Sequence, residues 1–396
     1  MNRATLRILS GLLAMALLTA CQQNKTPTPS EEAKAQWNTA RANVMLSLAT
    51  DQYNNGDFDR ARQTVDEAQR MDSKNAPLRI LSAQLAIEQG QLDVADRELA
   101  QARTLDPKNP KAFYLSGVVY QRWEQPDKAC AFYSTACDLD PGEQKYLLAK
   151  SEMLVDMNRV DDALSLLQAK VVFFENSPAI RDEVGLLLEQ KNQWVDAADM
   201  FRRATILAPD DLTTREHLAS ALYHIGQYAD AAEALERVLA DPKEQKRSDL
   251  YLMQGECRMH LNRIGDARES FTMAADIDSA NPLPLIELAK ASIALGDPTR
   301  AEADLRRATI AGGDEADISL LRGYMRLREN RLDEALAAFS RASALHPDDS
   351  VSVCMMGYVQ QKQGKFADAL ACYRKALKIQ PSDELAGRLL AGLDAN

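Results

Sequence analysis

Small and apolar residues recur along most of this chain with a constant period. An alanine repeats every 34 residues, with a single interval of 36, at Ala61, Ala95, Ala129, Ala163, Ala197, Ala231, Ala267, Ala301, Ala335 and Ala369. A second small residue precedes each of these alanines by twelve positions: Ala49, Ala83, Gly117, Ser151, Gly185, Ala219, Gly255, Ala289, Gly323 and Gly357. A fixed period of this length is typical of solenoids. Two small positions in each unit predict two helices that lie close together.

Apolar positions three and four residues apart predict two amphipathic helices in every unit. In the third unit, Phe113 and Tyr120 share a face of the first helix, and Ala129 and Tyr133 share a face of the second. The link between the helices is short and often contains glycine, which predicts a helical hairpin. Because one hairpin cannot bury its apolar stripe alone, each unit must stack on its neighbours.

The unit resembles the tetratricopeptide repeat, a helix-turn-helix of 34 residues. The third unit, counted from Pro110, carries the residues that this family favours at Phe113, Gly117, Tyr120, Ala129, Tyr133, Ala136 and Pro141. The resemblance covers residues 42 to 383 and implies an all-α, right-handed solenoid of about ten helix hairpins. After it, leucines at helical spacing predict a capping helix that covers the end of the stack: Leu385, Leu389, Leu390 and Leu393.

The expected organisation has six parts. They are a signal peptide over 1–20, a lipidated cysteine and tether over 21–30, an N-terminal helix with repeats 1–4 over 31–177, repeats 5–6 over 178–247, repeats 7–10 over 248–383, and the capping helix and tail over 384–396. Ser30 is a plausible start for the first helix. Three joints depart from the period, at 171–178, at 241–247 and at Gly312-Gly313, and limited proteolysis should cut there first. The apolar residues 171–174 form either a lengthened, buried helix end, which we favour, or an exposed patch.

The first 21 residues read as an export signal. Arg3 and Arg7 precede an apolar run from Ile8 to Leu18, which is too short to span a membrane. The segment 18–21, Leu-Thr-Ala-Cys, resembles the lipobox of bacterial lipoproteins, which implies cleavage after residue 20 and a lipid on Cys21. Gln22 in place of aspartate implies the periplasmic face of the outer membrane. The alternative is an ordinary secretory signal in which Cys21 is a coincidence.

The charge balance argues against nucleic acid as a partner. The chain has 47 basic and 58 acidic residues. Removal of the signal, which contains Arg3 and Arg7 and no acidic residue, leaves 45 basic and 58 acidic residues and therefore a net charge of −13. Phosphate binding needs clustered lysine and arginine, and such an acidic surface repels it.

Neither the cysteines nor the histidines form a recognised catalytic or metal motif. Cys354 and Cys372 lie at similar heights on the two helices of the last repeat, so they are either bridged or free. His224 and His260 occupy the same position in consecutive units and either share a metal or, as we favour, are solvated or hydrogen-bonded. No cofactor beyond the lipid, no small-molecule substrate and no enzymatic activity are expected.

The resemblance implies that positions five, nine, twelve and thirteen of each first helix face a concave groove. A tyrosine-rich groove suits an extended or helical protein segment, because tyrosine offers a large contact area with little loss of rotamer entropy. Some of these tyrosines could instead seal contacts between neighbouring units. The lysine and asparagine of chaperone-docking relatives are absent. The groove residues that we expect to bind a partner are Tyr53, Tyr114, Gln121, Arg122, Tyr223, His224, Met259, His260, Tyr324, Leu327, Arg328, Tyr358 and Lys362.

The sequence therefore predicts a lipid-anchored periplasmic scaffold that binds protein partners. Exported lipoproteins of this type resemble the assembly factors of Flp and type IV pili, so pilus, secretin or other envelope-complex subunits are the expected partners. Exopolysaccharide export or cell-wall synthesis complexes would need no different residues. An enzyme that carries repeats is less expected, because the repeats occupy residues 42 to 383 and leave no room for a catalytic domain.

Overall fold

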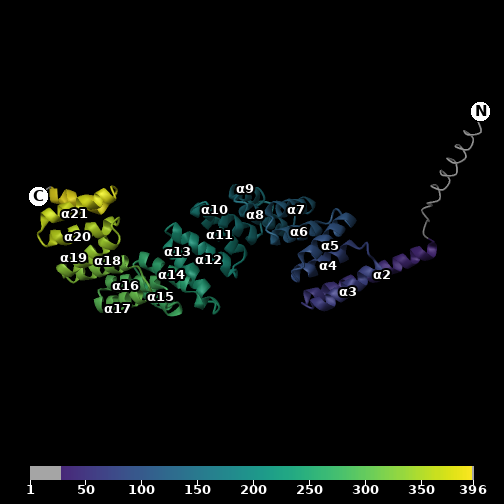
Figure 1. Ribbon diagram of the computed structural model, residues 1–396, viewed down its shortest axis with the longest axis horizontal. Coiled ribbons are helices and arrows are strands. Elements are labelled where there is room, and N and C mark those ends of the chain that lie inside the picture. The colour runs from purple at the N-terminus through teal and green to yellow at the C-terminus, as the bar shows by residue number, and fades with distance from the viewer. Residues whose placement is uncertain (1–27, 395–396) are drawn as a thin grey trace, which may run out of the picture. The chain divides into compact units, whose positions relative to one another are not determined.

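The computed structural model describes residues 28–394, and over this range helices joined by turns make up the fold, with no strand (Figure 1). The expected signal peptide, Cys21 and most of the expected tether lie outside the described residues. The described chain divides into two compact units, one that ends at residue 170 and one that begins at residue 171, which we describe separately.

Both units are built from helical hairpins. The helices of the first unit are α2 (Pro29–Asn54), α3 (Phe58–Met71), α4 (Ala76–Glu88), α5 (Leu92–Leu105), α6 (Pro110–Arg122), α7 (Pro126–Leu139), α8 (Gln144–Asp156) and α9 (Val160–Gln168). Those of the second unit are α10 (Pro178–Gln190), α11 (Trp194–Leu207), α12 (Leu212–His224), α13 (Tyr228–Leu239), the 3-10 helix η1 (Glu244–Lys246), α14 (Ser248–His260), α15 (Ile264–Ile277), α16 (Pro282–Leu295), α17 (Pro298–Ile310), α18 (Glu315–Arg328), α19 (Leu332–Leu345), α20 (Ser350–Lys362), α21 (Phe366–Ile379) and α22 (Glu384–Asp394).

Each repeat consists of a first helix and the second helix that follows it. The first helices have even numbers, from α2 to α20, and the second helices have odd numbers, from α3 to α21. α22 stands alone at the end. Within each unit, the second helix of one repeat also packs against the first helix of the next. All ten periodic alanines are completely buried. This confirms the prediction that small residues sit where helices contact each other.

The second small position follows a rule of size. Where it is glycine, the residue sixteen positions later on the second helix is aromatic, and a Cβ atom on the glycine would come within 3.0 Å of that ring. Where it is alanine or serine, the later residue is valine or leucine, as in the pair Ala83 and Leu99. The glycine therefore makes room for a ring that fills the hairpin. The five glycine–aromatic pairs are Gly117–Tyr133, Gly185–Phe201, Gly255–Phe271, Gly323–Phe339 and Gly357–Tyr373.

The turn inside each hairpin has a left-handed residue at the same place in all ten repeats. Five of these residues are glycines, as the sequence predicts, four are asparagines, and Glu124 is the exception. Asparagine is the next most tolerant residue in this conformation, because its short polar side chain can hydrogen-bond locally. The ten positions are Gly56, Gly90, Glu124, Asn158, Asn192, Gly226, Asn262, Gly296, Asn330 and Gly364.

The N-terminal helix begins slightly earlier than Ser30. α2 starts at Pro29, and the side chain of Thr28 accepts a hydrogen bond from the Glu31 backbone while the Glu31 carboxylate accepts one from the Thr28 backbone. This reciprocal capping box outcompetes Ser30 as the start of the helix. At the other end of the chain, the predicted capping helix is present as α22. Leu389, Leu390 and Leu393 pack against the core of the last repeat.

The joint after the fourth repeat differs from our preferred expectation. α9 has nine residues, whereas the other second helices have 12 to 14, and turns occupy residues 169–176. Val172 and Phe173 are 72% and 65% exposed, so the expectation of a buried, lengthened helix was wrong. The physical reason is Lys170, which is exposed where eight other repeats bury an alanine and the sixth buries Val238, so the helix loses its packing contact there.

Candidate functional site

The predicted groove residues lie on the first helices α2, α6, α12, α14, α18 and α20. None of the thirteen is fully buried. Five are exposed, namely Arg122, His224, His260, Arg328 and Lys362, and the other eight are partly buried. These side chains are therefore open to contact from solvent within each unit.

In the first unit, the predicted groove residues mainly join neighbouring repeats. The Tyr53 hydroxyl donates to Glu88 Oε1 at 3.2 Å, and Gln121 Nε2 donates to Glu152 Oε1 at 3.0 Å. The Tyr114 ring lies 5.6 Å from that of Tyr133 in its own hairpin and 5.1 Å from that of Tyr146 in the next. The expectation that some tyrosines seal contacts between units holds for Tyr53 and Tyr114.

The two predicted groove arginines cap the ends of helices. Arg122 Nη1 donates to the carbonyl oxygen of Ile87 at 2.7 Å, and Arg328 makes the same bond with Ile293. Each acceptor is 35 residues earlier, near the C-terminal end of the first helix in the preceding repeat. A guanidinium there satisfies a carbonyl and complements the negative end of the helix dipole.

The second unit contains a group of stacked rings that we call the aromatic cluster, defined as Trp194, Tyr223, His224, Tyr228 and His260. His224 stacks on Trp194 with ring centroids 3.9 Å apart, and His260 stacks on Tyr228 at 4.0 Å with the planes nearly parallel. The Tyr223 ring bridges the two stacks and lies 5.7 Å from His224 and 6.4 Å from His260, edge to face in each case. The cluster thus connects three consecutive repeats through partly exposed rings.

Sequence reasoning placed His224 and His260 in one groove but missed their partners. Trp194 and Tyr228 are the first residues of the second helices α11 and α13. Each of them stacks on the histidine that is the last residue of the first helix in the following repeat. An aromatic residue at the start of a second helix, followed by histidine at position thirteen of the next repeat, is the signal that could have found them. Within residues 28–394 there is no group of three or more potential metal ligands.

Acidic and basic side chains border the aromatic cluster. Burial, together with the carboxylate of Glu256, raises the pKa of Tyr223 to about 12, and the two side chains are hydrogen-bonded. Burial also raises the pKa of Glu256 above its ordinary value. Lys290 and Glu287 form an ion pair at 2.7 Å in the following repeat. A partner at this face would therefore meet flat rings beside hydrogen-bonding groups of both charges.

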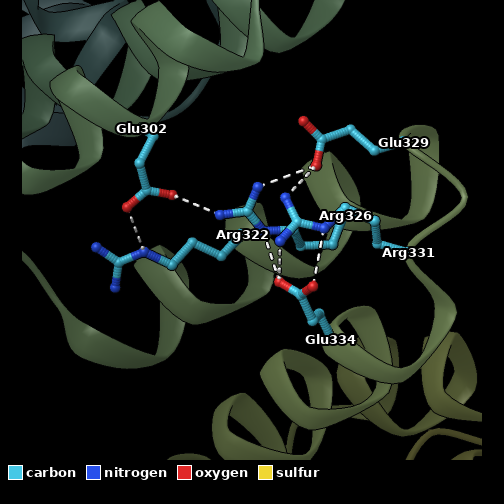
Figure 2. Close-up of polar contacts among 6 residues, drawn as sticks. All are labelled: Glu302, Arg322, Arg326, Glu329, Arg331 and Glu334. Carbon is cyan, nitrogen blue, oxygen red and sulfur yellow. Dashed lines mark hydrogen bonds and ion pairs between the residues drawn. The ribbon is translucent and has the colours of Figure 1, made fainter.

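A second polar group connects the eighth and ninth repeats (Figure 2). Arg326 of α18 contacts three glutamates, at 3.5 Å, 2.9 Å and 3.5 Å, and Arg331 contacts two of the same three. Three arginines face three glutamates, so the group is balanced and offers no free charge for an anion. It ties α17, α18 and α19 together near the predicted joint at Gly312-Gly313. Its members are Glu302, Arg322, Arg326, Glu329, Arg331 and Glu334.

The described cysteines are unsuited to nucleophilic chemistry. Cys354 and Cys372 are free thiols, and Cys372 Sγ donates to Gln360 Oε1 at 3.2 Å. Burial raises the pKa of Cys257 to about 12 and that of Cys354 to about 11. Since the thiolate is the reactive form, these side chains behave as small core residues. None of the helices in the described range is both long and apolar enough to cross a bilayer.

Family models described as tetratricopeptide repeat match most of the chain. The matched segments are residues 32–117, 110–143, 184–244, 216–282, 286–350 and 354–383.

Curated relatives are about a quarter identical to this chain over the segments that align. Human protein O-mannosyl-transferase TMTC1 is 24% identical over 183 residues, which is 45% of this chain and 21% of that protein. The bovine BBSome complex member BBS4 is 24% identical over 226 residues, 57% of this chain and 43% of that protein. The chain thus spans less than half the length of these relatives.

Solved structures with similar helical arrangements include Cut9-Hcn1 and PilW. The APC/C hetero-tetramer Cut9-Hcn1 has a TM-score of 0.45 and 14% identity, covering 89% of this chain and 90% of that one. PilW, a type IV pilus biogenesis factor, has a TM-score of 0.45 and 18% identity, covering 50% of this chain and 93% of that one.

Proposed function

Because the chain belongs to the tetratricopeptide repeat family, we propose that it is a scaffold that holds a segment of a partner protein on the aromatic cluster. The observation that carries this proposal is the pair of histidine stacks joined by Tyr223. Aromatic rings provide large, rigid contact areas, and their polar tips orient a bound backbone. Repeats of this type present extended binding surfaces.

The proposed ligand is an extended or helical protein segment rather than a small molecule. Its binding surface spans three repeats in sequence, from α11 to α14, and combines ring faces with the hydrogen-bonding groups of Tyr223 and Glu256. A protein segment can contact several repeats at once, whereas a small ligand needs an enclosed pocket. The curated relative BBS4 is by its name a member of a protein complex, which fits a role in assembly.

The proposed location is the periplasmic face of the outer membrane, with a lipid on Cys21. Its support is the sequence Leu-Thr-Ala-Cys at 18–21 behind Arg3, Arg7 and an apolar run. The eight residues from Cys21 to Thr28 would span up to about 30 Å at about 3.3 to 3.6 Å per residue. Two or more acyl chains hold a protein firmly at a membrane, so exchange of Cys21 for serine should move the protein from the membrane fraction to the soluble fraction. Its persistence in the membrane fraction would contradict the anchor.

The proposed partners are subunits of a pilus or secretin-type complex. An exopolysaccharide exporter or a cell-wall synthesis complex is the second candidate, because it would need the same kind of surface. In the native host, a photo-crosslinking amino acid at His260 should label the partner, and mass spectrometry of the adduct distinguishes the two candidates. The control position is Ile310, which is 87% exposed and belongs to a different repeat. Equal labelling at both positions, or none at His260, would contradict the aromatic cluster as the binding site.

A binding measurement separates recognition from folding. His224 and His260 are exposed, so the double change to alanine should lower the melting temperature by only a few degrees, through the loss of the two ring stacks. The same change should weaken partner binding at least about tenfold, which corresponds to about 1.4 kcal/mol. Tyr324 provides the contrast, because it is partly buried against Phe339 with ring centroids 5.4 Å apart. We expect Tyr324→Ala to lower stability, which is the result for a tyrosine that seals a packing contact rather than one that acts in the groove alone.

A further inference from the structure

The outward face of α2 carries an apolar stripe that no described part of the chain covers. Trp37, Val44 and Leu48 are 69%, 71% and 51% exposed. Their spacing of seven and four residues places them on one side of the helix. Ala42 and Ala49, on the opposite side, are completely buried against the first repeat. The exposed stripe is thus an apolar face additional to the one that holds α2 in the fold.

The central position of the stripe, that of Val44, is covered in every other repeat. The residue equivalent to Val44 is buried in each of the other nine repeats, for example Leu78, Ala112 and Tyr146. In the second repeat, Leu78 lies in one core cluster with Ala68 of α3, the second helix of the preceding repeat. The position of Val44 is therefore one that normally packs against the second helix of the preceding repeat, at a small residue of that helix. α2 has no preceding repeat within the described residues to supply one.

The charges beside the stripe indicate what kind of helix could cover it. Lys34 and Arg41 are exposed on one side of the stripe, one heptad apart, and neither is ion-paired within the described residues. A helix with acidic residues beside its apolar face would pair with both cations.

We propose that the face of α2 formed by Trp37, Val44 and Leu48 docks an amphipathic helix of a partner protein, one with alanines along its apolar side and acidic residues beside them. The docked helix takes the place that the second helix of a preceding repeat takes elsewhere in the chain. This site is distinct from the aromatic cluster, so the two can be tested independently.

The chain itself contains a suitable probe. α13 covers the equivalent face of α14, carries Asp230, Glu233 and Glu236, and has Val238 at the position that Ala68 occupies in α3. A fluorescent peptide with the sequence of residues 227–242 and alanine in place of Val238, held helical by a staple because so short a helix is marginal in water, should bind the full chain in mild detergent. Fluorescence anisotropy should show at least tenfold weaker binding to Val44→Lys. The matched control is Ile206→Lys, which changes a residue that is 72% exposed elsewhere and should bind the peptide as the wild type does.

Charge reversal tests the predicted pairing. Lys34→Glu with Arg41→Glu should weaken binding of the acidic peptide at least tenfold, and a peptide with Glu233→Lys and Glu236→Lys should bind this variant more tightly than it binds the wild type. No measurable binding to the wild type, or equal binding to Val44→Lys, would overturn the proposal. The proposal would also be overturned if the wild type self-associated, Val44→Lys abolished that self-association, and the peptide did not compete with it. It would likewise be overturned if Val44→Lys lost binding to vesicles but kept binding to the peptide.

Discussion

Phe201 occupies the space that a side chain on Gly185 would need. A Cβ atom on Gly185 would lie within 3.0 Å of the Phe201 ring, which is completely buried. Alanine favours a helix over glycine by about 1 kcal/mol, whereas overpacking a well-filled core costs about 1–3 kcal/mol. We therefore expect Gly185→Ala to destabilise the protein, despite its better helix propensity, by up to about 2 kcal/mol in urea unfolding.

The same contact predicts a rescue. Phe201→Leu in the Gly185→Ala background recreates the alanine–leucine pair of the repeat that contains Ala83 and Leu99, so it should recover part of the lost stability. Gly265→Ala is the matched control, because nothing lies within 4 Å of a Cβ atom there. If Gly185→Ala were as harmless as Gly265→Ala, the packing interpretation of the glycines would be wrong.

Glu124 is strained in the hairpin turn, and glycine should relieve that strain. Its φ of 56° lies in the left-handed region, where nine other repeats have glycine or asparagine. A side chain costs about 1 kcal/mol in this conformation, partly offset by the greater freedom of glycine in the unfolded chain. Glu124→Gly should therefore raise the free energy of unfolding by about 0.5 kcal/mol. Gly226→Ala should do the reverse, and a loss of stability in Glu124→Gly would contradict the argument.

Arg326 should contribute more than an isolated surface ion pair, because it contacts three glutamates. Arg326→Met should lower the free energy of unfolding by about 1 kcal/mol, and by less at high salt, since the group is partly exposed and is screened. Arg326 and Arg331 hold the pKa of Glu329 below its ordinary value, with the hydrogen bond from Arg326 as the largest cause. The stabilisation is therefore present above the ordinary glutamate pKa of 4.5 and is lost as the pH falls further.

Unfolding at two pH values checks this prediction. The difference between wild type and Arg326→Met should be larger at pH 7 than near pH 3. The control is Arg237→Met, which breaks a single pair with Glu233, 61% and 65% exposed, and should cost about 0.3–0.5 kcal/mol. Equal effects of the two substitutions would show that the network adds nothing.

His217 should make stability depend on pH near neutrality. Its Nδ1 lies 2.9 Å from Asp182 Oδ1 in the preceding repeat, and this hydrogen bond raises the pKa of His217 above its ordinary value of 6.5. A raised folded-state pKa stabilises the protein below 6.5, and the stabilisation is lost as the pH rises through the folded value. The wild type should therefore exceed His217→Gln in stability more at pH 6 than at pH 8. Asp182→Asn should abolish the same pH dependence, and a difference that does not change with pH would contradict the assignment.

The three irregular joints should differ in their sensitivity to proteases. Lys170 is exposed at the end of the short helix α9, next to exposed apolar residues. In the joint at 241–247, by contrast, Arg247 is ion-paired with Glu216 at 2.8 Å and with Asp249 at 2.6 Å. Brief trypsin treatment should therefore cut after Lys170 before it cuts in 241–247. Mass spectrometry of the first fragments checks this order, and earlier cleavage at Lys243 or Lys246 would contradict it.

The sequence alone determined the repeats, their helical hairpins and the capping helix. These features follow from local periodicity, because one period of small residues specifies which side of each helix must be buried. Five of the ten hairpin turns could also be predicted from glycine. The other five were missed, because asparagine and glutamate adopt the left-handed conformation only when the helices on both sides impose it.

The tertiary structure alone decided what most of the candidate site residues contact. Arg122 caps a helix end 35 residues away, and His260 stacks on Tyr228, which belongs to another repeat. The exposure of Phe173 and Val44 likewise depends on whether a neighbouring helix is present to cover them. Such contacts join residues on different helices, and a pattern read along one helix contains no information about which side chain faces it from the next.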